Sequence, residues 1–176
     1  MKKWIAFVLA IAAAKVLLLL PDTPTKQYFH NQGKIFGTYY NIRYQSTEDL
    51  HDFILTTLQQ VDHSLSMFNS NSVISKINRN DSVLLDSLFI TMYNEAQGIS
   101  QLSNGAFDIT VAPLVHAWGF GKNIENRSQI PTPLIDSIQE FVGYQLLSLR
   151  GNQIVKSDPR TTLDASAIAK GFACDI

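Results

Sequence analysis

Two short segments of the chain contain residue types that could bind a ligand, and the later of them in the chain suits a phosphate-bearing ligand together with a metal ion. In residues 163–176, Asp164 and Lys170 flank a run of small residues where a strand is expected to lead into a helix beginning near Ser166. A helix N-terminus favours negative phosphate charge, and the lysine ammonium adds a point charge. Alone, the pattern is weak, because aspartate is a common helix cap and lysine is usually a solvated residue.

The second segment, residues 105–121, begins at a turn at Asn104-Gly105 and contains Asp108. The Asp108 carboxylate could accept hydrogen bonds from a sugar or a ring N–H, or it could simply close an Asx turn. Phe68 is an aromatic residue in a polar loop, where it could stack on a flat ring. The four histidines show no metal-ligand spacing, and the sequence contains neither a P-loop nor a Rossmann fingerprint.

Composition limits the class of protein further. The 176 residues suit one ordinary domain, and the formal net charge of −1 gives no electrostatic reason to expect a nucleic-acid partner. A single cysteine, Cys174, excludes an intramolecular disulfide.

Residues 1–20 are predicted to be a signal peptide or signal anchor. Lys2 and Lys3 precede an apolar run, so the positive end should stay in the cytoplasm while the rest of the chain crosses the membrane. An uncleaved anchor is favoured, because cleavage after residues 12–14 would leave an exposed apolar tail. We therefore expect an exported protein at the periplasmic side of the inner membrane, with residues 21–32 as an extended linker.

Periodicity and capping residues predict alternating helices and strands. Asp86 is the predicted cap of a helix that ends before Asn104-Gly105. The other predicted elements are a strand over residues 36–44, helices over 50–65, 73–77 and 133–142, a hairpin of 144–149 with 153–156 around Gly151-Asn152, and a final strand over 161–163.

Five motifs that are modest individually occur in a specific order along residues 33–176. They are Phe36-Gly-Thr-Tyr39; Asp62-His-Ser-Leu-Ser-Met-Phe68 followed by Ser72-x-x-Ser-x-x-Asn78; Gly105-Ala-Phe-Asp-Ile-Thr110; Trp118-Gly-Phe-Gly121; and Asp164-x-x-x-Ile-Ala-Lys-Gly171. This order strongly resembles the ApbE family of FAD:protein FMN transferases.

The resemblance implies an α/β (α+β) fold, with a T-fold-like mixed sheet and flanking helices. It also implies that FAD and Mg²⁺ are bound. Members of the family split the FAD diphosphate and attach FMN through a phosphoester to a Thr or Ser hydroxyl of an acceptor flavoprotein, releasing AMP. Redox-pump subunits or flavoreductases are the implied type of acceptor.

Family roles carry over to particular positions of this chain. The positions that match FAD-binding residues are Phe36, Phe68, Ala106, Phe107, Asp108, Asp164 and Lys170, and the backbone carbonyl of Ala167 matches a magnesium ligand. The resemblance assigns no catalytic residue within this sequence.

Three departures from the family pattern change the expectations. Ala165-Ser166-Ala167 replaces the usual small-Gly-Gly run and narrows the space at the diphosphate. No lipobox cysteine is present, so any anchoring would be through the apolar segment. The family chain continues well beyond this point and supplies further magnesium ligands there, so residues 33–176 are predicted to be an N-terminal portion that is inactive alone.

Two alternative functions remain open at this point. One is a magnesium-dependent FAD pyrophosphatase, which would transfer FMN to water. The other is an exported protein that binds FAD without turning it over.

Overall fold

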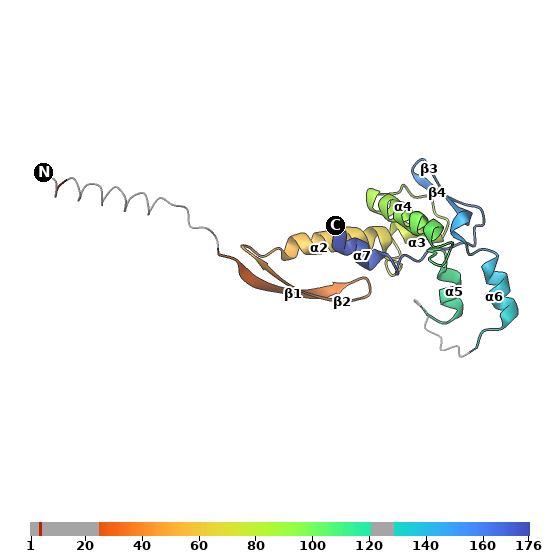
Figure 1. The fold of residues 1–176 in the computed structure, drawn as a ribbon, viewed down its shortest axis with the longest axis horizontal. Coiled ribbons are helices and arrows are strands. Elements are labelled where there is room, and N and C mark those ends of the chain that lie inside the picture. Colours follow the sequence, from red (N-terminus) through yellow and green to blue (C-terminus); the bar gives the residue numbers. More distant parts are fainter. Residues whose placement is uncertain (1–3, 5–24, 121–128) are drawn as a thin grey trace. The chain divides into compact units, whose positions relative to one another are not determined.

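The computed structural model of the chain describes residue 4, residues 25–120 and residues 129–176. The elements, labelled in Figure 1, are β1 (Gln27–Ile35), β2 (Thr38–Ser46), α2 (His51–Leu65), α3 (Val73–Asn78), α4 (Ser87–Leu102), α5 (Ala112–Ala117), α6 (Thr132–Gln139), η1 (Tyr144–Leu146), β3 (Leu147–Arg150), β4 (Gln153–Lys156) and α7 (Ala169–Asp175). The chain divides into two compact units. One contains the described residues up to Asn31 together with Ile42–Leu50, and the other contains Gln32–Asn41 and the described part of His51–Ile176.

The predicted signal segment, residues 1–20, lies outside the described residues except for Trp4. In the part of the chain that the structure describes, no helix is both long enough and apolar enough to cross a membrane.

The strands β1 and β2 form a two-stranded sheet. Phe36 and Gly37 connect them, with φ angles of 53° and 71°, and such left-handed pairs suit a tight hairpin connection. The strand predicted over residues 36–44 therefore begins two residues later, at Thr38. Residues 27–32, predicted as part of a linker, belong to β1 instead.

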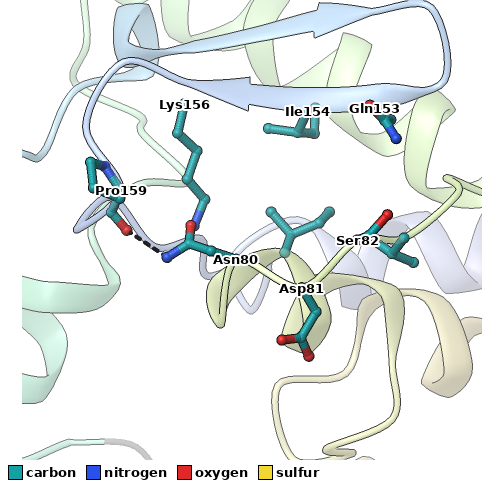
Figure 2. A pocket seen from close by; sticks show the side chains of 9 residues that line it. Asn80, Asp81, Ser82, Gln153, Ile154, Lys156 and Pro159 are labelled. Atoms are coloured by element: carbon teal, nitrogen blue, oxygen red, sulfur yellow. Dashed lines mark hydrogen bonds between the residues drawn. The ribbon is translucent and has the colours of Figure 1, made fainter.

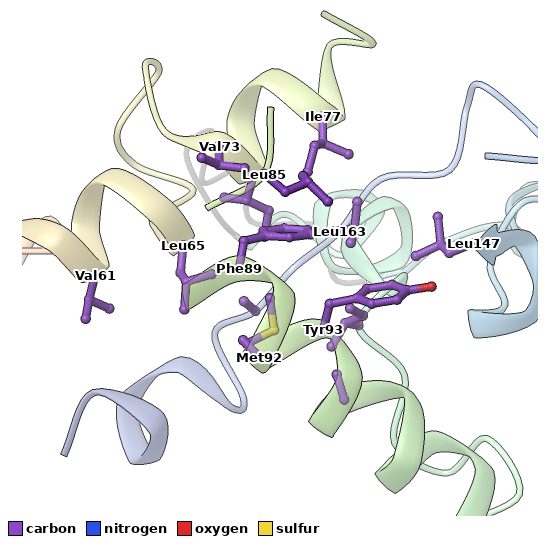
Figure 3. Close-up of a cluster of buried hydrophobic side chains, with 14 residues drawn as sticks. Val61, Leu65, Val73, Ile77, Leu85, Phe89, Met92, Tyr93, Leu147 and Leu163 are labelled. Carbon is purple, nitrogen blue, oxygen red and sulfur yellow. The ribbon is translucent and has the colours of Figure 1, made fainter. Parts of the chain in front are cut away.

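The hydrophobic core of the second unit is built around α4. Asp86 caps this helix as predicted, because its carboxylate accepts a hydrogen bond from the Phe89 backbone N–H at 2.8 Å. The same oxygen accepts a bond from the buried Ser64 hydroxyl at the end of α2, also at 2.8 Å. The fully buried side chains of Phe89 and Met92 on α4 then pack against α2, α3 and the segment around Leu163 (Figure 3).

The second sheet is the hairpin of β3 and β4, which pair antiparallel from Leu147↔Lys156 to Arg150↔Gln153. The predicted turn at Gly151-Asn152 is confirmed, and Gly151 has a φ of 59°. Residues 144–146, predicted as strand, form a short 3₁₀ helix before β3 begins.

The predicted single mixed sheet is not found among the described residues, although the mixed α and β content is confirmed. The predicted strand over residues 161–163 forms only one isolated parallel bridge, between Val111 and Thr162. One physical reason lies at Leu163, whose backbone N–H and C=O both bind the side-chain amide of Asn78 instead of a neighbouring strand.

Candidate functional site

The predicted Ala106-Phe107-Asp108 triplet follows a left-handed turn at the end of α4. Asn104 and Gly105 have φ angles of 50° and 81°, and the Gly105 N–H donates to the Ser100 carbonyl at 2.8 Å. Left-handed residues in this position end helices because they turn the chain away from the helix axis. Ala106 is exposed after this turn, whereas Phe107 packs against the hydrophobic core.

The carboxylate of Asp108 organises the loop around it. One of its oxygens accepts hydrogen bonds from the backbone N–H and the hydroxyl of Thr110, each at 2.7 Å. The other accepts from the Tyr144 backbone N–H at 2.7 Å. The Thr110 hydroxyl itself accepts from the Gly143 N–H at 2.7 Å. Asp108 therefore closes an Asx-type turn and also fixes a segment more than thirty residues away in the sequence.

Asp164 lies directly beside this loop. Its backbone N–H donates to the Ile109 carbonyl at 2.6 Å, so the segment containing Asp108 and the segment containing Asp164 are joined through their main chains. One oxygen of the Asp164 carboxylate accepts from the Ser166 N–H at 2.8 Å. The structure thus places two of the predicted site segments together.

The residues after Ala165 are more exposed than the segment that leads to them. Leu163 and Ala165 are fully buried, but Ser166 and Ala167 are exposed. The final helix was predicted to begin near Ser166, whereas α7 begins at Ala169 and has seven residues. Residues 166–168 instead form a turn, in which the Ile168 and Ala169 N–H groups both donate to the Ala165 carbonyl. Lys170 is exposed in the first turn of α7.

The predicted aromatic residues Phe36 and Phe68 both lie at the turn of the first hairpin, Phe36 within the turn and the Phe68 side chain beside Gly37. A Cβ atom placed on Gly37 would lie 3.2 Å from Cγ of Phe68, so the hairpin turn rests on this side chain. The Phe68 side chain is nevertheless 54% exposed. Phe36 also packs against the same hydrophobic cluster as Phe107.

Helix α3 connects the Phe68 loop to the Asp164 segment. Ser72 caps α3 and also donates its hydroxyl proton to the Ser66 carbonyl at 2.7 Å, which holds the start of the loop. At the other end of α3, the amide of Asn78 donates to the Leu163 carbonyl at 2.9 Å and accepts from the Leu163 N–H at 2.7 Å. The sequence motif with Ser72, Ser75 and Asn78 three residues apart was a signal for this helix face, but sequence reasoning gave it no role.

A pocket of about 430 Å³ lies elsewhere in the second unit, between β4 and the end of α3 (Figure 2). The Lys156 ammonium donates to the Asn80 side-chain carbonyl at 2.9 Å, and burial lowers the pKa of Lys156. The carboxylate of Asp81 pairs with Arg79 at 2.8 Å. None of the predicted ligand-binding residues lines this pocket, so it is separate from the candidate site.

Within the described part of the chain, no group of three or more His, Cys, Asp or Glu side chains could hold a metal ion. The Ala167 carbonyl, predicted as a magnesium ligand, lies on the exposed turn beside Asp164. No hydrogen bond from another described residue reaches this carbonyl oxygen.

Comparison with known sequences adds to this geometry. The model of the ApbE family matches residues 36–176. The chain is 30% identical over 186 residues to an FAD:protein FMN transferase of Vibrio cholerae, covering 100% of this chain and 54% of the relative. It is 31% identical to an FAD:protein FMN transferase of Haemophilus influenzae, covering 99% of this chain and 54% of the relative.

Solved structures give the same result for the fold. The flavin transferase ApbE from Vibrio cholerae superposes with a TM-score of 0.76 at 30% identity, over 85% of this chain and 52% of that one. The flavinyl transferase ApbE of Pseudomonas stutzeri superposes with a TM-score of 0.75 at 26% identity, over 88% of this chain and 52% of that one. The chain thus spans about half the length of the relatives it matches.

Proposed function

The chain belongs to the ApbE family, and on this premise we propose that it is the FAD-binding portion of an FAD:protein FMN transferase. In the proposed reaction, a Thr or Ser hydroxyl oxygen of an acceptor flavoprotein attacks the phosphorus atom of the FMN moiety. The P–O bond to the AMP moiety breaks, AMP leaves, and the hydroxyl proton is lost to solvent or to a base outside this sequence.

The observation that carries this proposal is the backbone hydrogen bond between Asp164 and Ile109. It joins the two segments whose residues match the family's FAD-binding positions, the triplet ending at Asp108 and the junction at Asp164. Both segments are held rigidly, by the Asp108 hydrogen bonds and by Asn78 respectively. Phosphoryl transfer depends mainly on positioning and charge stabilisation, so a rigid frame of this kind suits it.

Individual side chains have separate proposed tasks in binding FAD. Phe68 offers a half-exposed ring on which the flavin can stack. Lys170 is exposed in the first turn of α7, six residues after Asp164, and can neutralise phosphate charge. Asp108 already accepts three hydrogen bonds within the protein, so its first task is to shape the loop that presents Ala106 and Phe107.

The residues of this segment fit part of a magnesium shell. Ala167 is exposed, and its carbonyl oxygen accepts no hydrogen bond from the described residues, so both of its lone pairs are available to a cation. Mg²⁺ usually binds few protein oxygens and keeps water and phosphate oxygens as its other ligands, which agrees with Ala167 as a single contribution from this half of the site. When bound there, the ion would neutralise charge on the diphosphate and on the departing AMP.

The test of this function is flavin transfer by the full-length protein. It is incubated with FAD, Mg²⁺ and a candidate acceptor, and flavin fluorescence of the acceptor is read in a denaturing gel. A fluorescent acceptor band supports the transferase. Free FMN and AMP without a labelled acceptor would identify a pyrophosphatase instead. FAD that stays bound and unchanged would identify a protein that binds FAD without turning it over.

Asp164→Ala tests the site itself. We expect FAD binding to weaken at least tenfold, which corresponds to about 1.4 kcal/mol. His63→Ala and His116→Ala change two exposed side chains and serve as controls that should bind FAD like the unaltered protein. Equal titration curves for Asp164→Ala and these controls would refute the assignment.

The location of the protein is a separate proposal. We propose that residues 1–20 export the chain and anchor it at the periplasmic side of the inner membrane, on the strength of Lys2, Lys3 and the apolar run after them. Fractionation with protease added to spheroplasts tests this. Protection of the protein from the protease would contradict a periplasmic location.

A further inference from the structure

Helix α3 carries three polar side chains, Ser72 at its cap and Ser75 and Asn78 within it, at a spacing of three residues. Ser72 and Ser75 both direct their hydroxyls to the Ser66 carbonyl, at 2.7 and 3.5 Å. Asn78 makes both of its bonds to the backbone of Leu163. One short helix is therefore bonded at its first turn to the loop that leads into Phe68, and at its last turn to the residue before Asp164.

We infer that α3 sets the separation between the flavin-stacking residue Phe68 and the diphosphate-facing residue Asp164, and that Asn78 is a positioning residue for Asp164. This inference rests on the function proposed above. In it, Asn78 does not touch FAD. It acts by fixing the main chain at Leu163, from which the Asp164 side chain departs.

Asparagine is suited to this task by the chemistry of its amide. The Leu163 side chain is fully buried, so its backbone N–H and C=O need partners within the protein. A primary amide supplies one acceptor and one donor in a single plane, and it can bind both groups of one residue as a neighbouring strand would. Aspartate keeps the acceptor but has no donor when ionised, and leucine has neither.

The position of this contact makes its effect on the site specific. Leu163 is bound by Asn78, and the next residue, Asp164, donates to the Ile109 carbonyl at 2.6 Å. If the Asn78–Leu163 bonds are lost, only the Asp164–Ile109 bond still holds this part of the main chain. The Asp164 carboxylate should then sample more orientations. The hydrophobic packing of Leu163 against the core is left in place by the substitution.

The experiment compares Asn78→Leu and Asn78→Asp with a matched control, Asn152→Leu, in the full-length protein. Asn152 also donates its side-chain amide to a distant backbone carbonyl, that of Leu85 at 2.9 Å, but in the hairpin away from Asp164. We expect both Asn78 variants to weaken FAD binding about fivefold or more, roughly 1 kcal/mol, and Asn152→Leu to leave it unchanged. Faster hydrogen exchange at the Leu163 and Asp164 amides should accompany Asn78→Leu but not Asn152→Leu, whereas Asn78→Asp keeps the acceptor for the Leu163 N–H and should change exchange there less.

A double-mutant cycle separates positioning from general stability. If Asn78 acts through Asp164, Asn78→Leu should cost little further FAD affinity in the Asp164→Ala background, because the group it positions is already gone. Additive losses, or equal losses in Asn78→Leu and Asn152→Leu, would overturn the inference. Failure of the proposed function has a different signature: the unaltered protein would then leave the acceptor unlabelled in the flavin-transfer assay, whatever the Asn78 variants do to FAD binding.

Discussion

The hydrogen bonds of Thr110 allow a quantitative test of how the Asp108 loop is held. Thr110 is fully buried, and its hydroxyl donates to Asp108 and accepts from the Gly143 N–H, each at 2.7 Å. Thr110→Val keeps the shape of the side chain but removes both bonds. A hydrogen bond to a charged group contributes about 1.5–3 kcal/mol, and an unsatisfied buried N–H costs about 1–3 kcal/mol. Allowing for relaxation and for the added methyl group, we expect unfolding free energy to fall by about 3 kcal/mol.

Thermal unfolding followed by circular dichroism measures this loss. For a domain of this size a loss of 1 kcal/mol lowers Tm by roughly 2–4 °C, so Thr110→Val should melt about 6–12 °C lower. Thr110→Ser is the matched control, because it keeps the hydroxyl and loses only one methyl group. Its cost should be about 1 kcal/mol.

The order of the two variants decides the matter. If Thr110→Ser were as destabilising as Thr110→Val, packing of the methyl group and not the hydroxyl network would hold the loop. If Thr110→Val and the unaltered protein had the same Tm, Asp108 and Gly143 would have found other hydrogen-bond partners. The conclusion that the Thr110 hydroxyl holds the loop would then be wrong.

Three further predictions concern other parts of the fold. Asp86→Ala should lower the unfolding free energy by about 2 kcal/mol in a denaturant titration, because it removes the α4 cap and leaves the buried Ser64 hydroxyl without its hydrogen-bond acceptor. Asp86→Asn, which retains an oxygen acceptor, should lose less, and equal losses would contradict the capping argument. Gly37→Ala should cost about 1 kcal/mol by thermal melting, because φ is 71° and the new Cβ would lie 3.2 Å from the Phe68 side chain; an unchanged Tm would refute the close contact. Burial raises the pKa of Tyr93 against the opposing effect of its hydrogen bond from Gln97. The stabilising contribution of neutral Tyr93 is therefore complete below the unfolded pKa of 10.0 and is lost as pH rises above it. Tyr93→Phe should reduce the loss of stability above pH 10 in urea titrations at several pH values, and parallel curves for the two proteins would exclude this effect.

Local signals in the sequence predicted the elements that local chemistry determines. Asp86 as a helix cap, the left-handed stop at Asn104-Gly105 and the turn at Gly151-Asn152 are each decided by residues within a few positions of one another. The short helix predicted over residues 73–77 is also confirmed as α3, although its cap, Ser72, was not predicted.

The elements that were missed depend on contacts that periodicity does not report. In β1 the inward positions include Asn31 and Gly33, so the strand lacks the apolar alternation that would have revealed it. The segment over residues 161–163 has a strand-like sequence, but Asn78 takes the backbone groups of Leu163 that strand pairing would use.

The candidate site was predicted as a set of positions and not as a set of contacts. The motifs gave the residues of the two segments that Asp164 and Ile109 bring together. They did not reveal that the Asp108 carboxylate accepts hydrogen bonds from Thr110 and Tyr144. The bond from Tyr144 links residues that come close together only in the folded chain.

The bonds between Asn78 and Leu163 also have a consequence for the order of folding. They join residues 85 positions apart, and closing a flexible loop of that length costs about 4 kcal/mol in chain entropy. Two hydrogen bonds at about 1 kcal/mol each cannot offset this cost. The pair must therefore form after burial of Leu163 and Ala165 has already drawn the distant segments together. Phe68 can be held early by contacts near it in the chain, whereas Asp164, which lies between Leu163 and Ala165, can reach its place only with their burial, and competence to bind FAD should not appear before that step.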